Sequence, residues 1–310
     1  MVRFEKETLS VHQTASGAHY EIDVYRYDPP NPTETVHLQG GLHGIELTGI
    51  PVLYEFMKLV EEAQLPHRII CVPQSNPMGL DSQIMGVQTG YNNLHTNQQN
   101  CWNWNRIGQL RGDGSQEGEW VDLLLNLTEP ADTVLDLHTA GAETAPHVYA
   151  HVSQVEQAQC LGLPHVLAWE QHSTSFCDTC QQLGKVALTL ELSASRAITS
   201  EDVERGIQAL QRYFGILPKA PAARVWSIRE HLKRWLSPSG GVLTWHRRAG
   251  EYIQQGEPLA TLYTRQGKQE LASPYSGLLL LKNPTHACIA MIPPTLQRPY
   301  ICKGAYMVSN

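Results

Sequence analysis

The chain has 310 residues, of which 42% are hydrophobic and 17% charged, as is usual for a globular protein. Its formal net charge is -7 and it has no cluster of Lys and Arg, which argues against nucleic acid or an anionic membrane as a partner and favours a small-molecule substrate. No apolar run is long enough to span a bilayer, and the charged start of the chain differs from a secretory signal, so we expect a cytoplasmic protein.

Alternating β-rich runs and helical patterns from about residue 34 to 215 predict an α/β domain built around a mostly parallel sheet. We expect strands at 34–39, 68–73, 132–138, 146–151 and 185–191, and helices at 46–62, 118–127 and 200–214. Residues 74–117 are polar and rich in Gly, Asn and Gln. A connection of this length is more often functional than a simple linker, so we predict that it roofs a site.

The Pro/Ala-rich stretch at 216–222 predicts a linker, and the sequence changes character after it. Residues 237–310 show short strands separated by turn signals and no helical pattern. We therefore predict a catalytic domain at 1–220 and a smaller all-β domain at 221–310.

The seven cysteines are an odd number in a chain too long to need disulfides, so we expect free thiols. Cys177 and Cys180 form a CxxC, but no second CxxC follows at the spacing of a zinc ribbon. The neighbouring Phe176 and Gln181 favour the face of a helix, and we interpret this motif as structural rather than metal-binding.

A candidate metal site follows from residues at the ends of the predicted strands. His43 and Glu46 come directly after one strand, at a spacing that brings both side chains to the same side of a first helical turn. His138 ends another strand, and Asp136 lies two residues earlier on the same face. Open α/β sheets bind ligands at such strand ends, and two His with one Glu is the ligand set of catalytic zinc.

Each of these residues also has a simpler interpretation. A single HxxE is common by chance, and a His at a strand end is often a hydrogen-bonded surface residue. Glu191, which ends the apolar strand at 185–191, is either a general base that faces the metal or a carboxylate that caps a turn or pairs with Arg196. The zinc hypothesis is favoured because three ligand types fall at strand ends of one sheet.

Five motifs occur together, in order, and resemble the succinylglutamate desuccinylase/aspartoacylase family of zinc carboxypeptidase-like hydrolases. They are G-G-x-H-G-x-E at 40–46, S-N-P-M-G at 75–79, N-R at 105–106, D-L-H-T at 136–139 and T-x-E at 189–191. The resemblance implies a carboxypeptidase-like α/β/α domain with a mixed sheet, and one zinc ion per chain, held at His43, Glu46 and His138. It also implies a catalytic base at Glu191.

The resemblance assigns further roles around this site. It implies that Asn105 and Arg106 hold a substrate carboxylate or polarise the scissile carbonyl, and a guanidinium suits that role because it binds a carboxylate bidentately. Asp136 is the expected partner of the ligand His138. The 221–310 segment resembles the small β domain, similar to a biotinyl/lipoyl barrel-sandwich, that ends many predicted deacylases of this family. Since Lys268 lacks the neighbours of a carrier site, we interpret this domain as a lid or as a contact in a homo-oligomer.

Two departures from the family pattern concern the substrate. The Arg expected about seven residues before Asn105 is absent, and Gln98 lies there instead. The usual Asp-Leu before Asn-Arg is replaced by Asn103-Trp104. These changes indicate a substrate other than succinylglutamate or acetylaspartate.

The sequence therefore predicts a zinc-dependent amidohydrolase that deacylates a small N-acyl amino acid or related N-acyl amine. The alternatives are a zinc carboxypeptidase that acts on peptides and a non-catalytic binding protein of the same fold.

Overall fold

The computed structural model describes residues 1–13, 17, 19–84, 87–88, 94–95, 101–140, 143–192, 198–229, 232–282 and 286–291. Among these, no helix has the length and apolar character needed to cross a membrane.

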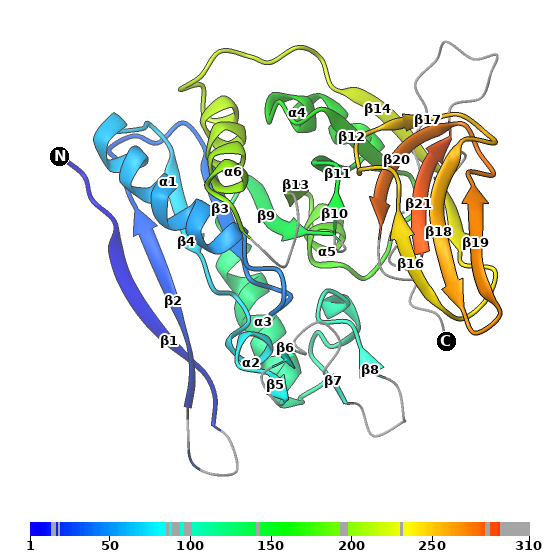
Figure 1. Cartoon of the computed structure of the whole chain (residues 1–310). Coiled ribbons are helices and arrows are strands. Elements are labelled where there is room, and N and C mark those ends of the chain that lie inside the picture. Colours follow the sequence, from blue (N-terminus) through cyan, green and yellow to red (C-terminus); the bar gives the residue numbers. More distant parts are fainter. Residues whose placement is uncertain are drawn as a thin grey trace.

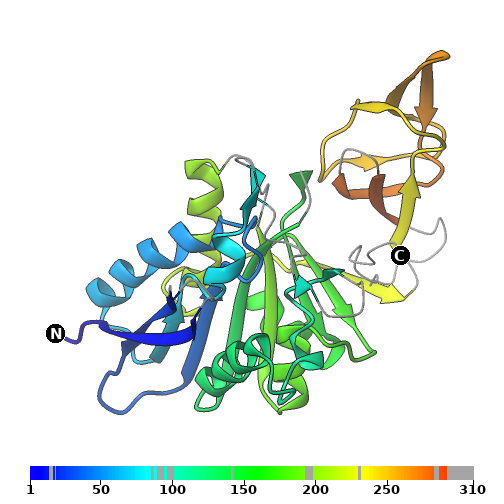
Figure 2. The ribbon, with the colours of Figure 1, turned by 90° about the horizontal axis from the view of Figure 1, so that it is seen from below.

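A nine-stranded mixed sheet forms the centre of the molecule, with helices on both faces (Figures 1 and 2). The strands, in spatial order, are β1 (Glu5–Gln13), β2 (His19–Tyr27), β4 (Arg68–Val72), β3 (Thr35–Gly40), β9 (Thr133–Thr139), β13 (Val186–Leu192), β11 (His147–His151), β12 (His165–Trp169) and β14 (Arg224–Arg229). The four strands β4, β3, β9 and β13 are parallel, and β11 pairs with β13 in the opposite direction. The start of β11 therefore lies at the same edge as the ends of β9 and β13.

Two apolar cores pack the helices onto this sheet. One core joins a face of the sheet to α1 (Gly49–Ala63) and α6 (Ser200–Tyr213). The other joins the opposite face to α3 (Gln116–Thr128) and α5 (Phe176–Gln182). The helices α2 (Pro77–Leu80) and α4 (Val155–Cys160) and the 3-10 turns η1 (Ile107–Gln109) and η2 (Val152–Gln154) are short. The predicted α/β/α architecture is confirmed.

All five predicted strands and all three predicted helices are present, and the sheet is mixed as expected, with five of the eight pairings between its neighbouring strands parallel. The sequence did not predict the β1–β2 hairpin, β12, β14 or α4, whereas α5 agrees with the helix face indicated by Phe176 and Gln181. Cys177 and Cys180 lie on α5, are buried and are free thiols, as are Cys71 and Cys160. The remaining cysteine side chains lie outside the part of the chain that the structure describes.

The segment 74–117 folds into short pieces where it is described. Two small hairpins pair β5 (Gln83–Ile84) with β6 (Val87–Gln88) and β7 (Leu94–His95) with β8 (Cys101–Trp102). The segment then returns to the sheet through η1, and Gly108 N donates to the carbonyl of Thr174 at 3.0 Å. Just before η1, Asn103 Oδ1 lies 2.7 Å from His43 Nε2, so this part of the segment lies beside the turn that follows β3.

The C-terminal part is all-β in its described residues, as predicted. Its strands are β15 (Leu232–Leu236), β16 (Val242–Trp245), β17 (Tyr252–Ile253), β18 (Pro258–Thr264), β19 (Gly267–Ala272), β20 (Gly277–Lys282) and β21 (His286–Met291). They form two antiparallel sheets beyond the β14 edge of the large sheet (Figure 2).

Each of the two parts contributes a strand to a sheet of the other part, on either side of the predicted boundary at 220/221. The strand β14 follows this boundary and completes the large sheet. In return, β10 (Glu143–Thr144), which comes just after β9, pairs with β20 of the C-terminal sheet. The boundary itself stays a prediction.

Candidate metal centre

His43 and Glu46 lie in a turn between β3 and α1. The chain leaves β3 through Gly41, whose φ of 71° favours glycine, and the Glu46 N–H then donates to the His43 carbonyl at 3.0 Å. The helix begins only at Gly49, so the two residues precede it and do not form its first turn as the sequence suggested. A Cβ atom at Gly44 would overlap the backbone of Gly79, so the turn also needs glycine there.

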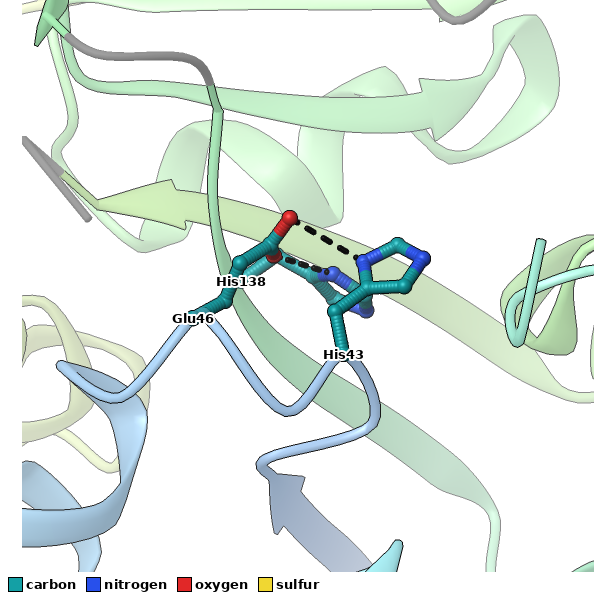
Figure 3. A group of neighbouring side chains, drawn as sticks. All are labelled: His43, Glu46 and His138. Carbon is teal, nitrogen blue, oxygen red and sulfur yellow. Dashed lines mark hydrogen bonds and ion pairs between the residues drawn. The ribbon is translucent and has the colours of Figure 1, made fainter. Parts of the chain in front are cut away.

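The turn brings both side chains to His138, at the end of β9. His43 Nδ1 lies 3.0 Å from Glu46 Oε1, and His138 Nδ1 lies 2.8 Å from Glu46 Oε2 (Figure 3). One ligand atom from each residue falls within 4.8 Å of the others. All three side chains are buried, with about 2% of each residue exposed. The sequence-predicted ligands thus converge on one point.

The hydrogen bond made by Nε2 of His43 shows that this ring nitrogen carries hydrogen. Asn103 Oδ1 is 2.7 Å from His43 Nε2 and also 2.7 Å from the backbone N–H of Asn105. Because a backbone N–H can only donate, this atom of Asn103 must be the acceptor oxygen. His43 Nε2 therefore carries hydrogen, which leaves Nδ1, the nitrogen that faces Glu46, as the atom that could bind a metal.

In His138, too, Nε2 is the nitrogen that carries hydrogen, and a longer chain of hydrogen-bonded side chains fixes this. Its Nε2 lies 2.7 Å from Asp136 Oδ2, and Asp136 Oδ1 accepts from Gln39 Nε2 at 3.1 Å. Gln39 Oε1 in turn lies 3.2 Å from His37 Nε2. Since a carboxylate only accepts, His138 Nε2 carries hydrogen and Nδ1 faces Glu46.

Three electron-rich groups therefore meet at one buried point, which requires a cation or a proton there. Without metal, the site holds a proton: burial opposes charge on His138, but Asp136 and Glu46 outweigh it and set the pKa of that ring well above its usual value. Burial likewise opposes charge on Glu46, yet His43 and His138 hold the pKa of this carboxyl at about 2. Two imidazole nitrogens and a carboxylate oxygen suit zinc.

Glu191 lies on β13 beside this centre. It is the register partner of His138, so the two side chains leave neighbouring strands on the same face of the sheet. Glu191 is buried, and its Oε2 has no hydrogen-bond partner among the described residues. Burial first, and then the charge of Glu46, raise the pKa of Glu191 to about 8 in the metal-free chain. This environment is typical of a proton-transfer group.

Asn105 and Arg106 lie next to the ligand partner Asn103. The Asn105 side-chain oxygen accepts from the N–H of Phe176 at 2.8 Å, so this atom holds the start of α5. Arg106 is half-buried; its N–H donates to the Asn103 carbonyl at 2.9 Å and its Nη1 to the Asn105 carbonyl at 3.0 Å. Their predicted contacts with substrate stay predictions.

Two residues around the centre were not assigned a role from the sequence. The contact of Asn103 with His43 had one signal, since Asn103 stands where the family pattern has an acceptor Asp. His147 is the register partner of Glu191 on β11, and the alternation of a strand alone does not distinguish a side chain that faces the pocket from one that packs in the core. Arg196 and Gln98 lie outside the described residues.

Comparison with known proteins gives a consistent result. A family model described as the succinylglutamate desuccinylase/aspartoacylase catalytic domain matches residues 32–217. No curated protein matches significantly.

Similar solved structures share the fold at low sequence identity. A Shewanella amazonensis protein assigned to this family superposes with a TM-score of 0.80 at 20% identity, over 92% of this chain and 98% of its own. A Shewanella frigidimarina protein with the same assignment gives 0.77 at 18%, over 94% and 98%. The product-bound ectoine utilization protein EutE from Ruegeria pomeroyi gives 0.74 at 18%, over 93% and 94%.

Proposed function

The chain belongs to the succinylglutamate desuccinylase/aspartoacylase family, and from this premise we propose that it is a zinc-dependent deacylase. Its proposed substrate is a small N-acyl amino acid or related N-acyl amine, whose amide bond it hydrolyses. The observation that carries the proposal is the convergence of two imidazole lone pairs and one carboxylate, with a buried Glu beside them.

His43, Glu46 and His138 would hold the metal, and one ion per chain fits this set of ligands. Zinc bound there would supply a Lewis acid that polarises a carbonyl and acidifies water. Asn103 and Asp136 fix the ring orientation of the two His ligands through contacts of 2.7 Å each. The Nδ1 atoms of both rings therefore already face Glu46 before any metal binds.

Glu191 is the proposed catalytic residue. As a carboxylate it takes a proton from the attacking water, and as a carboxylic acid it returns this proton to the leaving nitrogen. Burial raises the pKa of this carboxyl in the metal-free chain, and a nearby cation would lower it again, so both protonation states lie within reach of neutral pH. Arg106 is proposed to hold the carboxylate of the substrate or the developing negative charge on the carbonyl oxygen, as a guanidinium does well.

The test is metal analysis combined with a substrate screen. We expect about one zinc per purified chain, and release of free amine from N-acetyl and N-succinyl amino acids that stops when the metal is chelated. Peptides with a free C-terminus belong in the same screen, since cleavage of these alone would favour a carboxypeptidase. A chain that binds no zinc and hydrolyses none of these compounds would be a binding protein.

Glu191→Gln separates the base from the metal site. The amide keeps the size of the side chain but cannot exchange a proton, so turnover should fall by about a hundredfold to ten-thousandfold. Zinc content should stay at the wild-type value because Glu191 is not a ligand. Unchanged turnover would remove Glu191 from the mechanism.

A further inference from the structure

His147 has one ring nitrogen in use and one that has no partner. Its Nδ1 lies 2.8 Å from the Ala145 carbonyl, which can only accept, so Nδ1 carries the hydrogen. Nε2 is therefore an acceptor, and no described residue donates to it. The side chain is fully buried, with 0% exposure, so open solvent does not satisfy this atom. Most buried polar atoms have a hydrogen-bond partner, so the unpaired Nε2 of His147 calls for a functional or structural explanation.

The sheet places His147 in line with the proposed catalytic groups. His138, Glu191 and His147 are register partners across β9, β13 and β11, so their side chains form a row on one face of the sheet. Neighbouring strands lie about 4.8 Å apart, which puts His147 roughly 10 Å from His138 with Glu191 between them.

The order of His138, Glu191 and His147 along the sheet matches the order of the carbonyl, the nitrogen and the nitrogen substituents in an amide substrate. The metal end of the row would receive the carbonyl, Glu191 serves the nitrogen, and the substituents of that nitrogen extend further along the row. His147 would thus meet the amine half of the substrate.

We propose that His147 Nε2 accepts a hydrogen bond from an N–H or O–H group in the amine half of the substrate, beyond the scissile nitrogen. The proposal rests on the deacylase function and narrows its substrates to N-acyl amines that carry such a donor. A carboxylate at this place would set oxygen lone pairs against the lone pair of His147 and the carboxylate of Glu191. The site therefore disfavours an acidic side chain on the amine.

Burial also keeps His147 in the accepting form. It lowers the pKa of the ring to about 3, despite the carbonyl of Ala145, so His147 stays neutral at physiological pH. An apolar group in the same place would leave a buried acceptor without a partner, which should lower kcat/KM for such a substrate about 10-fold to 100-fold.

The experiment compares three N-acetyl amino acids on zinc-loaded protein. Glutamine offers a side-chain N–H, methionine has a similar length without a donor, and glutamate replaces the amide with a carboxylate. We expect kcat/KM for N-acetyl-L-glutamine to exceed that for N-acetyl-L-methionine by about 10-fold to 100-fold, with N-acetyl-L-glutamate lowest. In His147→Phe, which keeps an aromatic ring but has no acceptor, the glutamine-to-methionine ratio should fall to about one while zinc content is retained.

His165→Phe is the matched control. His165 is the next residue in the row, on β12, but its Nδ1 accepts from Trp226 Nε1 at 3.4 Å. Because that ring already has a partner, its replacement should leave the glutamine-to-methionine ratio unchanged.

The outcomes separate the two proposals. Equal kcat/KM for glutamine and methionine in the wild type overturns the role of His147, even if His147→Phe does not fold, and leaves the deacylase function intact. If none of the three compounds is hydrolysed, the deacylase proposal fails. Thermal stabilisation by the same compounds then tests the acceptor, and equal stabilisation by the glutamine and methionine derivatives would overturn it.

Discussion

At the scale of single residues, the two His ligands are oriented by partners of different charge. A neutral carboxamide, Asn103, accepts from His43, whereas a carboxylate, Asp136, accepts from His138. A charged acceptor forms the stronger hydrogen bond and makes the opposite ring nitrogen a better donor to a metal. His43 is therefore the less strongly supported of the two ligands.

Asn103→Asp should tighten zinc binding. The substitution keeps the shape of the side chain and the bond from the Asn105 N–H, and adds negative charge beside His43 Nε2. We expect the dissociation constant for zinc to fall about 10-fold, and Asn103→Leu to raise it about 10-fold to 100-fold. Competition with a zinc chelator measures both.

The matched control is Asn126→Asp, the same change at an exposed position on α3. It should leave the dissociation constant unchanged. If Asn103→Asp behaves like Asn126→Asp, then Asn103 does not support His43.

Glu191 should make the stability of the metal-free protein depend on pH. Its pKa rises from 4.5 to about 8 on folding, so the folded state binds the proton more tightly than the unfolded state. The stability that results is complete below about pH 4.5 and is lost as the pH rises toward 8. Glu191→Gln has no such proton to lose.

Melting temperatures of the chelated wild type and of Glu191→Gln, measured from pH 5 to pH 8, test this directly. The variant should become progressively more stable than the wild type as the pH rises. Bound zinc should reduce the difference, because a nearby cation favours the carboxylate. Parallel curves for the two chelated proteins would contradict the raised pKa of Glu191.

The sequence singled out the three proposed ligands because each ends a recognisable strand or follows it directly. It did not predict the contact between Asn103 and His43, which lie 60 residues apart, because the path of the intervening loop is not encoded in local periodicity. The sequence also could not predict that Nε2 of His147 has no partner, because this depends on which carbonyl accepts a hydrogen bond from the other ring nitrogen.

At the scale of elements, the direction of β11 decides which residues reach the site. The sequence predicted a strand at 146–151 but not that it runs against β13, and this reversal puts His147 beside Glu191. The unpredicted β12 is a short, largely apolar segment of five residues. In such segments the hydrophobic pattern does not distinguish strand from buried helix.

The start of α5 depends on a side chain from the loop that carries Arg106. Asn105 Oδ1 accepts from the N–H of Phe176, and Ser175 Oγ accepts from the N–H of Asp178. Asn105→Ala leaves the first of these N–H groups without its partner. We expect a loss of about 1 kcal/mol in the free energy of unfolding, comparable to the loss of a helix cap.

Chemical denaturation of the metal-free protein measures this loss. Gln109→Ala is a suitable control, because Gln109 is exposed and its side chain contacts only the hydroxyl of Thr174, at 3.3 Å, among the bonds that the structure describes. If the two variants are equally stable, then Asn105 does not secure α5.

At the scale of the whole molecule, the C-terminal sheet holds the segment between His138 and His147. The Ala145 N–H donates to the Leu280 carbonyl at 2.8 Å, and the Ala145 carbonyl is the partner of His147 Nδ1. The orientation of His147 thus depends on the position of β20. This link gives the β domain a role at the site that the sequence, read as two consecutive domains, did not predict.

An ion pair between β10 and β20 lies beside the Ala145 hydrogen bond, and its removal should weaken the pairing of these two strands. Lys282 Nζ lies 2.8 Å from Glu143 Oε2 and also donates to the Arg247 carbonyl at 2.7 Å, and its side chain is only 12% exposed. Lys282→Ala should therefore weaken the pairing of β10 with β20. A loss of about 1 kcal/mol corresponds to roughly fivefold faster hydrogen exchange at the Ala145 amide.

Hydrogen exchange of the whole protein, read by mass spectrometry from the proteolytic fragment that covers residues 143–147, measures this change. Lys268→Ala, on the exposed strand β19, is the control and should leave the exchange rate at Ala145 unaltered. Zinc affinity should stay at the wild-type value in both variants, because Asp136 on β9 orients His138 independently of β10. Slow exchange at Ala145 in Lys282→Ala would show that the apolar contacts of β20 alone hold the segment. A loss of zinc in that variant would instead show that the C-terminal sheet supports the metal ligands themselves.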